Sequence, residues 1–100
     1  MATSSKVLAR TAAATSSATL YTTPALTTTV VTNILITNTA SSTANATISF
    51  DGVVVVPAVL LDANSVTALD IKQVLDPADL ITGFATATSV NFHISGVEIV

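Results

Sequence analysis

The stretch from residue 44 to residue 61 constrains the fold more than any other part of the chain. Apolar and polar residues alternate strictly through positions 46–51, with the period of two that a strand with one buried face requires. The pair Asp51-Gly52 follows, and this pair is favoured where a two-residue turn needs positive φ at both positions. Residues 53–56 are all Val, a β-branched residue that suits a pleated, buried surface. The stretch therefore predicts a β-hairpin whose second strand ends or bends at Pro57.

Further segments carry a strand signal and are separated by turns rich in Gly, Pro, Asn, Asp and Ser. These segments cover residues 18–23, 27–39, 66–74, 80–86 and 89–100. Segment 27–39 has apolar residues on both faces, which indicates a central strand that is covered on two sides. In the last segment the alternation changes phase near Gly96, which indicates a β-bulge. About seven strands and no long helix predict an all-β fold, either an antiparallel β-sandwich or a jelly-roll-like barrel.

We expect the core to form from the apolar residues that share a face on these strands. They are Val30, Ile34, Ile36, Ile48, Phe50, Val53, Val55, Leu69, Ile71, Val90, Phe92 and Ile94. One hundred residues are enough for one domain with a modest core of this kind.

Charged residues are scarce in this chain. They make up 9% of it, against about 25% in ordinary soluble domains, whereas half of the residues are hydrophobic and 18 Thr and 10 Ser fill much of the remainder. A surface with few charges and with exposed strand edges repels neighbouring copies poorly. We therefore expect the protein to bury these surfaces against copies of itself, as a homotrimer, or against other proteins.

Residues 1–17 differ in composition from the body of the domain, residues 18–100. They are rich in Ala, Ser and Thr without a clear period, and they hold two of the three cations, whereas all six acids lie between Asp51 and Glu98. We interpret them as an N-terminal arm that is flexible when free and becomes ordered along a neighbouring subunit. A short helix over residues 5–14 and a simple solvated tail are the alternatives.

Four residues of the arm are the candidates for partner binding. Val7 and Leu8 would bury apolar surface on the neighbour, and Lys6 and Arg10 would pair with its acids. Exposed ion pairs contribute only about 0–1 kcal/mol each, so we expect the apolar contacts to matter more.

The sequence contains no recognisable catalytic or cofactor motif. Its single histidine, His93, lies mid-strand between Asn91 and Ser95, without a nucleophile motif elsewhere. There is no Cys, and the Asp residues lie in turns, where their side chains bond nearby backbone N–H groups. We therefore expect no enzymatic activity, no cofactor and no metal.

Two classes of partner are also disfavoured. Three cations cannot sustain a nucleic-acid interface. The longest apolar run, residues 53–61, is interrupted by Pro57 and is far shorter than the ~20 residues of a membrane helix. The first seventeen residues lack the sustained apolar region of a secretory signal. We expect neither nucleic acid nor membrane as a partner.

A succession of strand and turn motifs runs through residues 19–100. It comprises TLYTTP at 19–24, TTVVTN at 28–33, ITN at 36–38, LLDAN at 60–64, LDIKQVL at 69–75 and VNFHISGVE at 90–98. In these motifs the chain resembles a family of small virion proteins of tailed bacteriophages. The resemblance implies β-sandwich subunits that trimerise or pack on capsids, necks or tails. The chain departs from the family pattern at residues 76–79, where Asp-Pro-Ala-Asp replaces a Gly-Asp turn, and in its long N-terminal segment.

The resemblance implies a capsid decoration (cement) protein. Such a protein is made in the host cytoplasm, binds the outside of the shell between subunits of the phage major capsid protein, and stabilises the shell of the virion. A neck, tail or head-fibre component is the first alternative. A carbohydrate-binding host-recognition module is the second, although four aromatic residues offer little for stacking on sugars.

Overall fold

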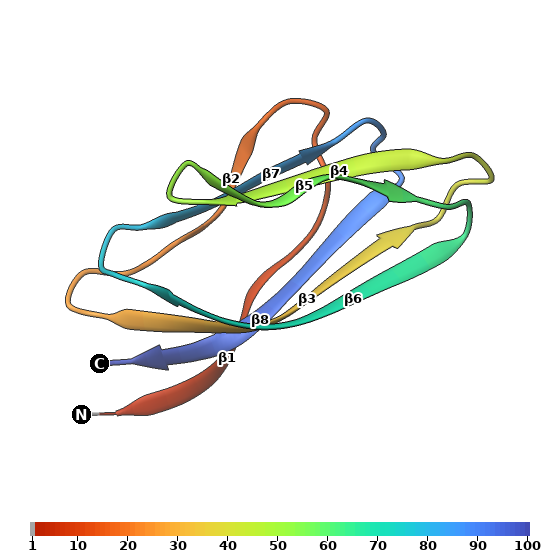
Figure 1. Cartoon of the computed structure of the whole chain (residues 1–100). Helices are drawn as coiled ribbons and strands as arrows, with labels where there is room; N and C mark the ends of the chain where they lie inside the picture. Colours follow the sequence, from red (N-terminus) through yellow and green to blue (C-terminus); the bar gives the residue numbers. More distant parts are fainter. Residues whose placement is uncertain (1) are drawn as a thin grey trace.

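Two four-stranded antiparallel sheets lie one above the other in the computed structural model, which describes residues 2–100 (Figure 1). The strands are β1 (Thr3–Ala12), β2 (Ala18–Thr22), β3 (Thr28–Asn38), β4 (Ala44–Phe50), β5 (Val53–Leu61), β6 (Ser65–Leu75), β7 (Leu80–Ala85) and β8 (Val90–Ile99). Sheet A has the order β1-β8-β3-β6, and sheet B has the order β2-β7-β4-β5. The prediction of an all-β fold is confirmed, and the described residues form one strand more than the seven or so expected.

The hairpin that connects β4 to β5 forms as the sequence predicts. Asp51 and Gly52 form its turn with φ values of 50° and 81°, so both positions have the positive φ that this turn requires. Pro57 does not end β5, because β5 continues to Leu61, and the strand is irregular there, with a positive φ of 43° at Ala58. The register between β4 and β5 shifts on both sides of Ile48, so β5 is an irregular edge strand.

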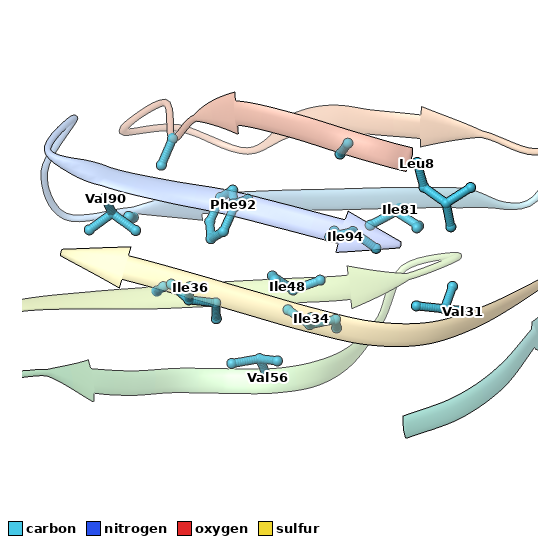
Figure 2. Close-up of a cluster of buried hydrophobic side chains, with 14 of the residues drawn as sticks. Leu8, Val31, Ile34, Ile36, Ile48, Val56, Ile81, Val90, Phe92 and Ile94 are labelled. Carbon is cyan, nitrogen blue, oxygen red and sulfur yellow. The ribbon is translucent and has the colours of Figure 1, made fainter. Parts of the chain in front are cut away.

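Inward-facing side chains from both sheets form the core (Figure 2). Most of the predicted core is confirmed as buried, namely Ile34, Ile36, Ile48, Phe50, Val90, Phe92 and Ile94. Val55, Leu69 and Ile71 pack against this core and are partly buried.

Two predicted core residues are wrong, one because of irregular strand pairing and the other because of its place at the edge of sheet B. On β3 the register shifts between Val31 and Asn33, so Val31 is buried in place of Val30. Val53 pairs with Phe50 but is 70% exposed, because it lies beside the hairpin turn on the edge strand β5; the register shift beside Ile48 then puts Val56 in the core. A bulge changes which alternate residues face inward, and a prediction that carries one phase along a whole strand then fails.

The segment that we expected to be an arm belongs largely to sheet A. Thr3–Ala12 forms β1 and pairs with β8 along its length, so neither an arm outside the sheet nor a helix over residues 5–14 describes it correctly. The register shifts at Leu8, and Leu8 and Ala9 are both buried although they are adjacent. This bulge removes the simple alternation that would have identified β1 as a strand. Met1 lies outside the described residues.

Gly96 on β8 faces the core between two bulged neighbours. β3 carries the extra residue Thr32 beside the step from Ser95 to Gly96, and β1 carries the extra residue Leu8 beside the step from Ile94 to Ser95. The expected bulge near Gly96 therefore lies on the neighbouring strands. A Cβ atom at Gly96 would lie 2.3 Å from the carbonyl oxygen of Val30 and 2.9 Å from Cδ1 of Leu8. Glycine at this position allows three strands to approach one another closely.

We expect Gly96→Ala to destabilise the fold by about 1–3 kcal/mol, the usual range for overpacking. Its methyl group would collide with backbone, which cannot move without disturbing the pairing of β3 with β8. Gly83→Ala is the matched control, because the nearest atom there, at 3.0 Å, is the end of the Leu20 side chain. Denaturant unfolding of both variants measures the difference. An equal loss in the two variants would contradict this account of Gly96.

We expect Phe50→Ala to cost about 3–5 kcal/mol, because it leaves a cavity in the core. Phe50 is 8% exposed, whereas Phe84, the matched control, is 36% exposed. Phe84→Ala should therefore cost clearly less. Thermal melts of both variants check this order, and an unchanged melting temperature for Phe50→Ala would place Phe50 outside the core.

Candidate interaction surface

A polar cluster closes one end of the space between the sheets. The Tyr21 hydroxyl, from sheet B, donates a hydrogen bond of 2.5 Å to Oε2 of Glu98 in sheet A and lies 2.9 Å from Oγ1 of Thr29. Lys6 Nζ lies 3.2 Å from the other carboxylate oxygen of Glu98. Strands β1, β2, β3 and β8 thus meet in one hydrogen-bonded group.

The cluster shifts the pKa values of both acidic groups. The hydrogen bond from Tyr21 lowers the pKa of Glu98, and the nearby Lys6 acts in the same direction. Burial, together with the hydrogen bond to Glu98, raises the pKa of Tyr21 to about 12. The shifts favour a charged carboxylate beside a neutral phenol, which is the arrangement in which the hydrogen bond is strongest.

A second polar group, centred on Asn38, closes the opposite end of β3. The side chain of Asn38 is 1% exposed, and its Nδ2 donates to the carbonyl oxygens of Ser42 at 2.9 Å and Asp62 at 3.2 Å. Its Oδ1 accepts from the backbone N–H of Ala40 and from the hydroxyl of Ser89, both at 3.2 Å. One buried amide therefore connects the loops that follow β3, β5 and β7.

The His and Asp side chains that were considered as possible catalytic or metal-binding groups lie apart from one another. His93 is half-buried on the outer face of sheet A, opposite Arg10 on β1 and Leu35 on β3. Asp79 caps its own turn by accepting a hydrogen bond of 3.0 Å from the N–H of Asp76. Within residues 2–100, no group of three His, Asp or Glu side chains is placed to hold a metal ion. The same residues include no helix of the length and apolarity needed to cross a membrane.

The four candidate residues of the N-terminal segment have different environments. Leu8 is 7% exposed and belongs to the core of its own chain, and Lys6 pairs with Glu98 of its own chain. Val7 is 45% exposed, and Arg10 is exposed as well. Val7 and Arg10 share the outer face of sheet A, because they pair with Ser95 and His93 of β8. The structure thus leaves these two residues on an outer edge strand.

Strand β6, the opposite edge of sheet A, carries exposed residues that sequence reasoning did not single out. Val66 and Val74 are each 62% exposed, and Asp70 and Lys72 lie between them. All four occupy alternate positions of one strand, and this spacing could have identified them in the sequence as residues of one face. Their exposure follows from the position of β6 at the edge of the sheet, which the sequence does not reveal.

Strand β5, the edge of sheet B, adds further exposed apolar surface. Val53, Val54 and Leu60 are 70%, 53% and 63% exposed. β5 in sheet B continues through a short turn, residues 62–64, into β6 in sheet A (Figure 1). Exposed apolar side chains on neighbouring edge strands are typical of surfaces that bind other proteins.

Comparisons with known proteins add no relatives. No protein-family model matches the chain, and no curated protein or solved structure is significantly similar to it.

We expect Tyr21→Phe to lower the free energy of unfolding by about 1.5–3 kcal/mol near neutral pH, the usual value of a hydrogen bond to a charged group. Because the folded pKa of Glu98 is lowered, this stabilisation is present above its ordinary pKa of 4.5 and is lost as the pH falls through the folded value. Because the pKa of Tyr21 is raised from 10.0 to about 12, the stabilisation is also lost as the pH rises through that interval.

Urea unfolding of the wild type and of Tyr21→Phe between acid and alkaline pH measures this effect. The difference between the two proteins should be constant from about pH 5 to pH 10 and should shrink on either side. A difference that does not vary with pH would show that the variant acts through packing alone.

Proposed function

We propose that this protein is a non-enzymatic structural protein of a tailed-bacteriophage virion. In this proposal it is made in the host cytoplasm, binds the outside of the capsid shell between subunits of the major capsid protein, and stabilises the shell. It also associates with itself as a homotrimer. The observation that carries the proposal is the exposed apolar surface on the edge strands of a protein with very few charges.

The strand order supports the proposal by analogy of fold. We infer that the two sheets form a jelly roll, since the order β1-β8-β3-β6 over β2-β7-β4-β5 interleaves strands from both halves of the chain. Viral capsid proteins and lectin domains are known users of the eight-stranded jelly roll. A fold alone does not fix a function, so the exposed surface of the protein is the more specific support.

The free surface fits a protein that works while bound to others. Val53, Leu60, Val66 and Val74 are each more than half exposed on β5 and β6. Edge strands with exposed apolar side chains favour association, and a shell offers repeated partners that bury them. Few charges oppose this association.

The N-terminal segment retains a partner-binding role in the proposal, as an edge strand. Val7 and Arg10 offer an apolar and a cationic contact on the free edge of β1. Lys6 and Leu8 act indirectly, because the ion pair of Lys6 with Glu98 and the burial of Leu8 hold β1 in place.

A neck, tail or head-fibre component of the same virion is the alternative. The same exposed edges would serve a small ring or fibre as well as a shell. The number of copies in a particle separates the two proposals, because a decoration protein occurs in proportion to the capsid subunits and a neck or tail protein occurs in a few copies.

Quantitative gel analysis of virions purified from a phage whose genome encodes this chain tests the proposal. We expect a band whose intensity is comparable with that of the major capsid protein. A faint band of a few copies per particle would favour the neck or tail, and absence from the particle would rule out a virion role.

We expect Val7→Asp to reduce binding to undecorated shells, because it places an acid at the proposed apolar contact with a neighbouring subunit of the assembly on the shell. Thr88→Asp, in the exposed turn before β8, is the matched control and should bind normally. Melting temperatures of both variants exclude a folding defect as the cause. Equal binding of the two variants would remove Val7 from the contact.

A further inference from the structure

The two free edges of sheet A are complementary to each other. We propose that β6 of one copy pairs with β1 of a second copy in antiparallel fashion, so that sheet A continues from subunit to subunit. The inference specifies the self-association included in the proposed function and rests on that part alone.

The directions of the strands permit this continuation. β1 pairs antiparallel with β8, β8 with β3, and β3 with β6, so β1 and β6 run in opposite directions at the two edges of one sheet (Figure 1). A copy related by rotation about an axis along the strands brings its β1 beside β6 as an antiparallel neighbour. Such a head-to-tail contact joins two different surfaces. It closes into a ring when a whole number of copies completes one full rotation.

The free edge of β1 exposes the backbone groups of alternate residues. The N–H of Ala13 donates to the carbonyl oxygen of Val90 at 2.8 Å, so position 13 faces β8. In an antiparallel pair, successive residues direct their N–H and C=O groups to opposite sides. Arg10 and Ala12 therefore direct these groups away from β8, to the free edge.

The free edge of β6 also exposes the backbone groups of alternate residues. The N–H of Thr39 donates to the carbonyl oxygen of Ser89 at 3.1 Å, so the alternate residue Asn38 faces β6, where it pairs with Ser65. Counting by two from Ser65, Thr67 and Leu69 also face β3, so the intervening Ala68 and Asp70 direct their backbone groups to the free edge. The free N–H and C=O groups of β6 and β1 can therefore bond to each other when Asp70 lies opposite Arg10 and Ala68 lies opposite Ala12.

The side chains agree with this register. Arg10 and Asp70 are exposed on the outer face of sheet A, and the ion pair formed within residues 2–100 joins other residues, Lys6 and Glu98. Placing Arg10 opposite Asp70 sets opposite charges directly across the strands, where such pairs stabilise a sheet. Ala12 and Ala68 are small and exposed, so they meet without a clash.

The bulges also match. On β3, Val30 and Asn33 are three residues apart and pair with Val74 and Asp70 of β6, which are four residues apart. On β1 the bulge at Leu8 gives the outward residues Val7 and Arg10 the same spacing of three. β3 already pairs with one side of β6 at this spacing. The β1 strand of a second copy can therefore pair with the free side of β6 at the same spacing. Val7, 45% exposed, then meets Val74, 62% exposed.

Engineered disulfides test the pairing, and the chain has no Cys to interfere. Opposed residues of an antiparallel pair lie about 5.5 Å apart between Cα atoms, within the range that a disulfide spans. We expect an equal mixture of the Ala12→Cys and Ala68→Cys variants to yield a covalent heterodimer under mild oxidation. The variant that carries both substitutions should form a ladder that ends at a closed trimer.

The controls distinguish this pairing from others. Ala25→Cys, in an exposed turn, should not cross-link with Ala12→Cys. Self-linking of Ala68→Cys alone at the same rate as the mixture would mean that β6 pairs with β6, and would overturn the inference. Absence of the heterodimer from variants with normal melting temperatures would overturn it as well.

Charge reversal provides a second readout. Arg10→Asp should slow cross-linking of the Cys pair several-fold, and adding Asp70→Arg should restore the rate. If the reversed pair fails to restore it, the Arg10–Asp70 register is wrong. Counting copies on the virion remains independent, because abundant copies without cross-linking would remove this inference and leave the capsid role in place.

Discussion

Burial of aliphatic side chains between the two sheets is the interaction on which the rest of this structure depends. Val90, Phe92 and Ile94 on β8 have no exposed surface, and they face buried residues of sheet B such as Ile48 and Ile81 (Figure 2). Apolar surface removed from water stabilises a fold by about 25 cal/mol per Å². The single ion pair within residues 2–100, with Lys6 half-exposed, contributes little beside that. Stability and a low charge content are therefore compatible here.

Polar groups at the two ends of β3 complete this apolar layer. Tyr21 and Glu98 connect the sheets at one end, and Asn38 connects three loops at the other. Buried polar groups are costly unless their hydrogen bonds are satisfied, and here the partners include residues distant in sequence, Glu98 for Tyr21 and Ser89 for Asn38. The two clusters therefore fix how the sheets and loops lie relative to each other, whereas the apolar layer supplies most of the stability.

Local sequence rules predicted the elements that depend on local structure. The hairpin around Asp51-Gly52 is an example, because alternation and turn chemistry both lie within a few residues. β1 escaped prediction because the bulge at Leu8 depends on the missing side chain of Gly96, far along the chain. The same holds for the pair Tyr21 and Glu98, which are 77 residues apart. The exposure of Val66 and Val74 required knowledge of which strand forms the edge, and topology alone decides this.

The ends of the chain are held together by the sheet itself. Ala2 and Val100 exchange two backbone hydrogen bonds, of 3.2 and 2.8 Å, beyond the last paired residues of β1 and β8. A short linker between the termini would turn these two strands into an ordinary hairpin, and the chain could then be opened at a surface loop without changing either sheet. The order in which the strands are synthesised is thus separable from the order in which they pair. For the same reason, a segment fused to either terminus would leave the domain from the same end, beside the cluster of Tyr21 and Glu98.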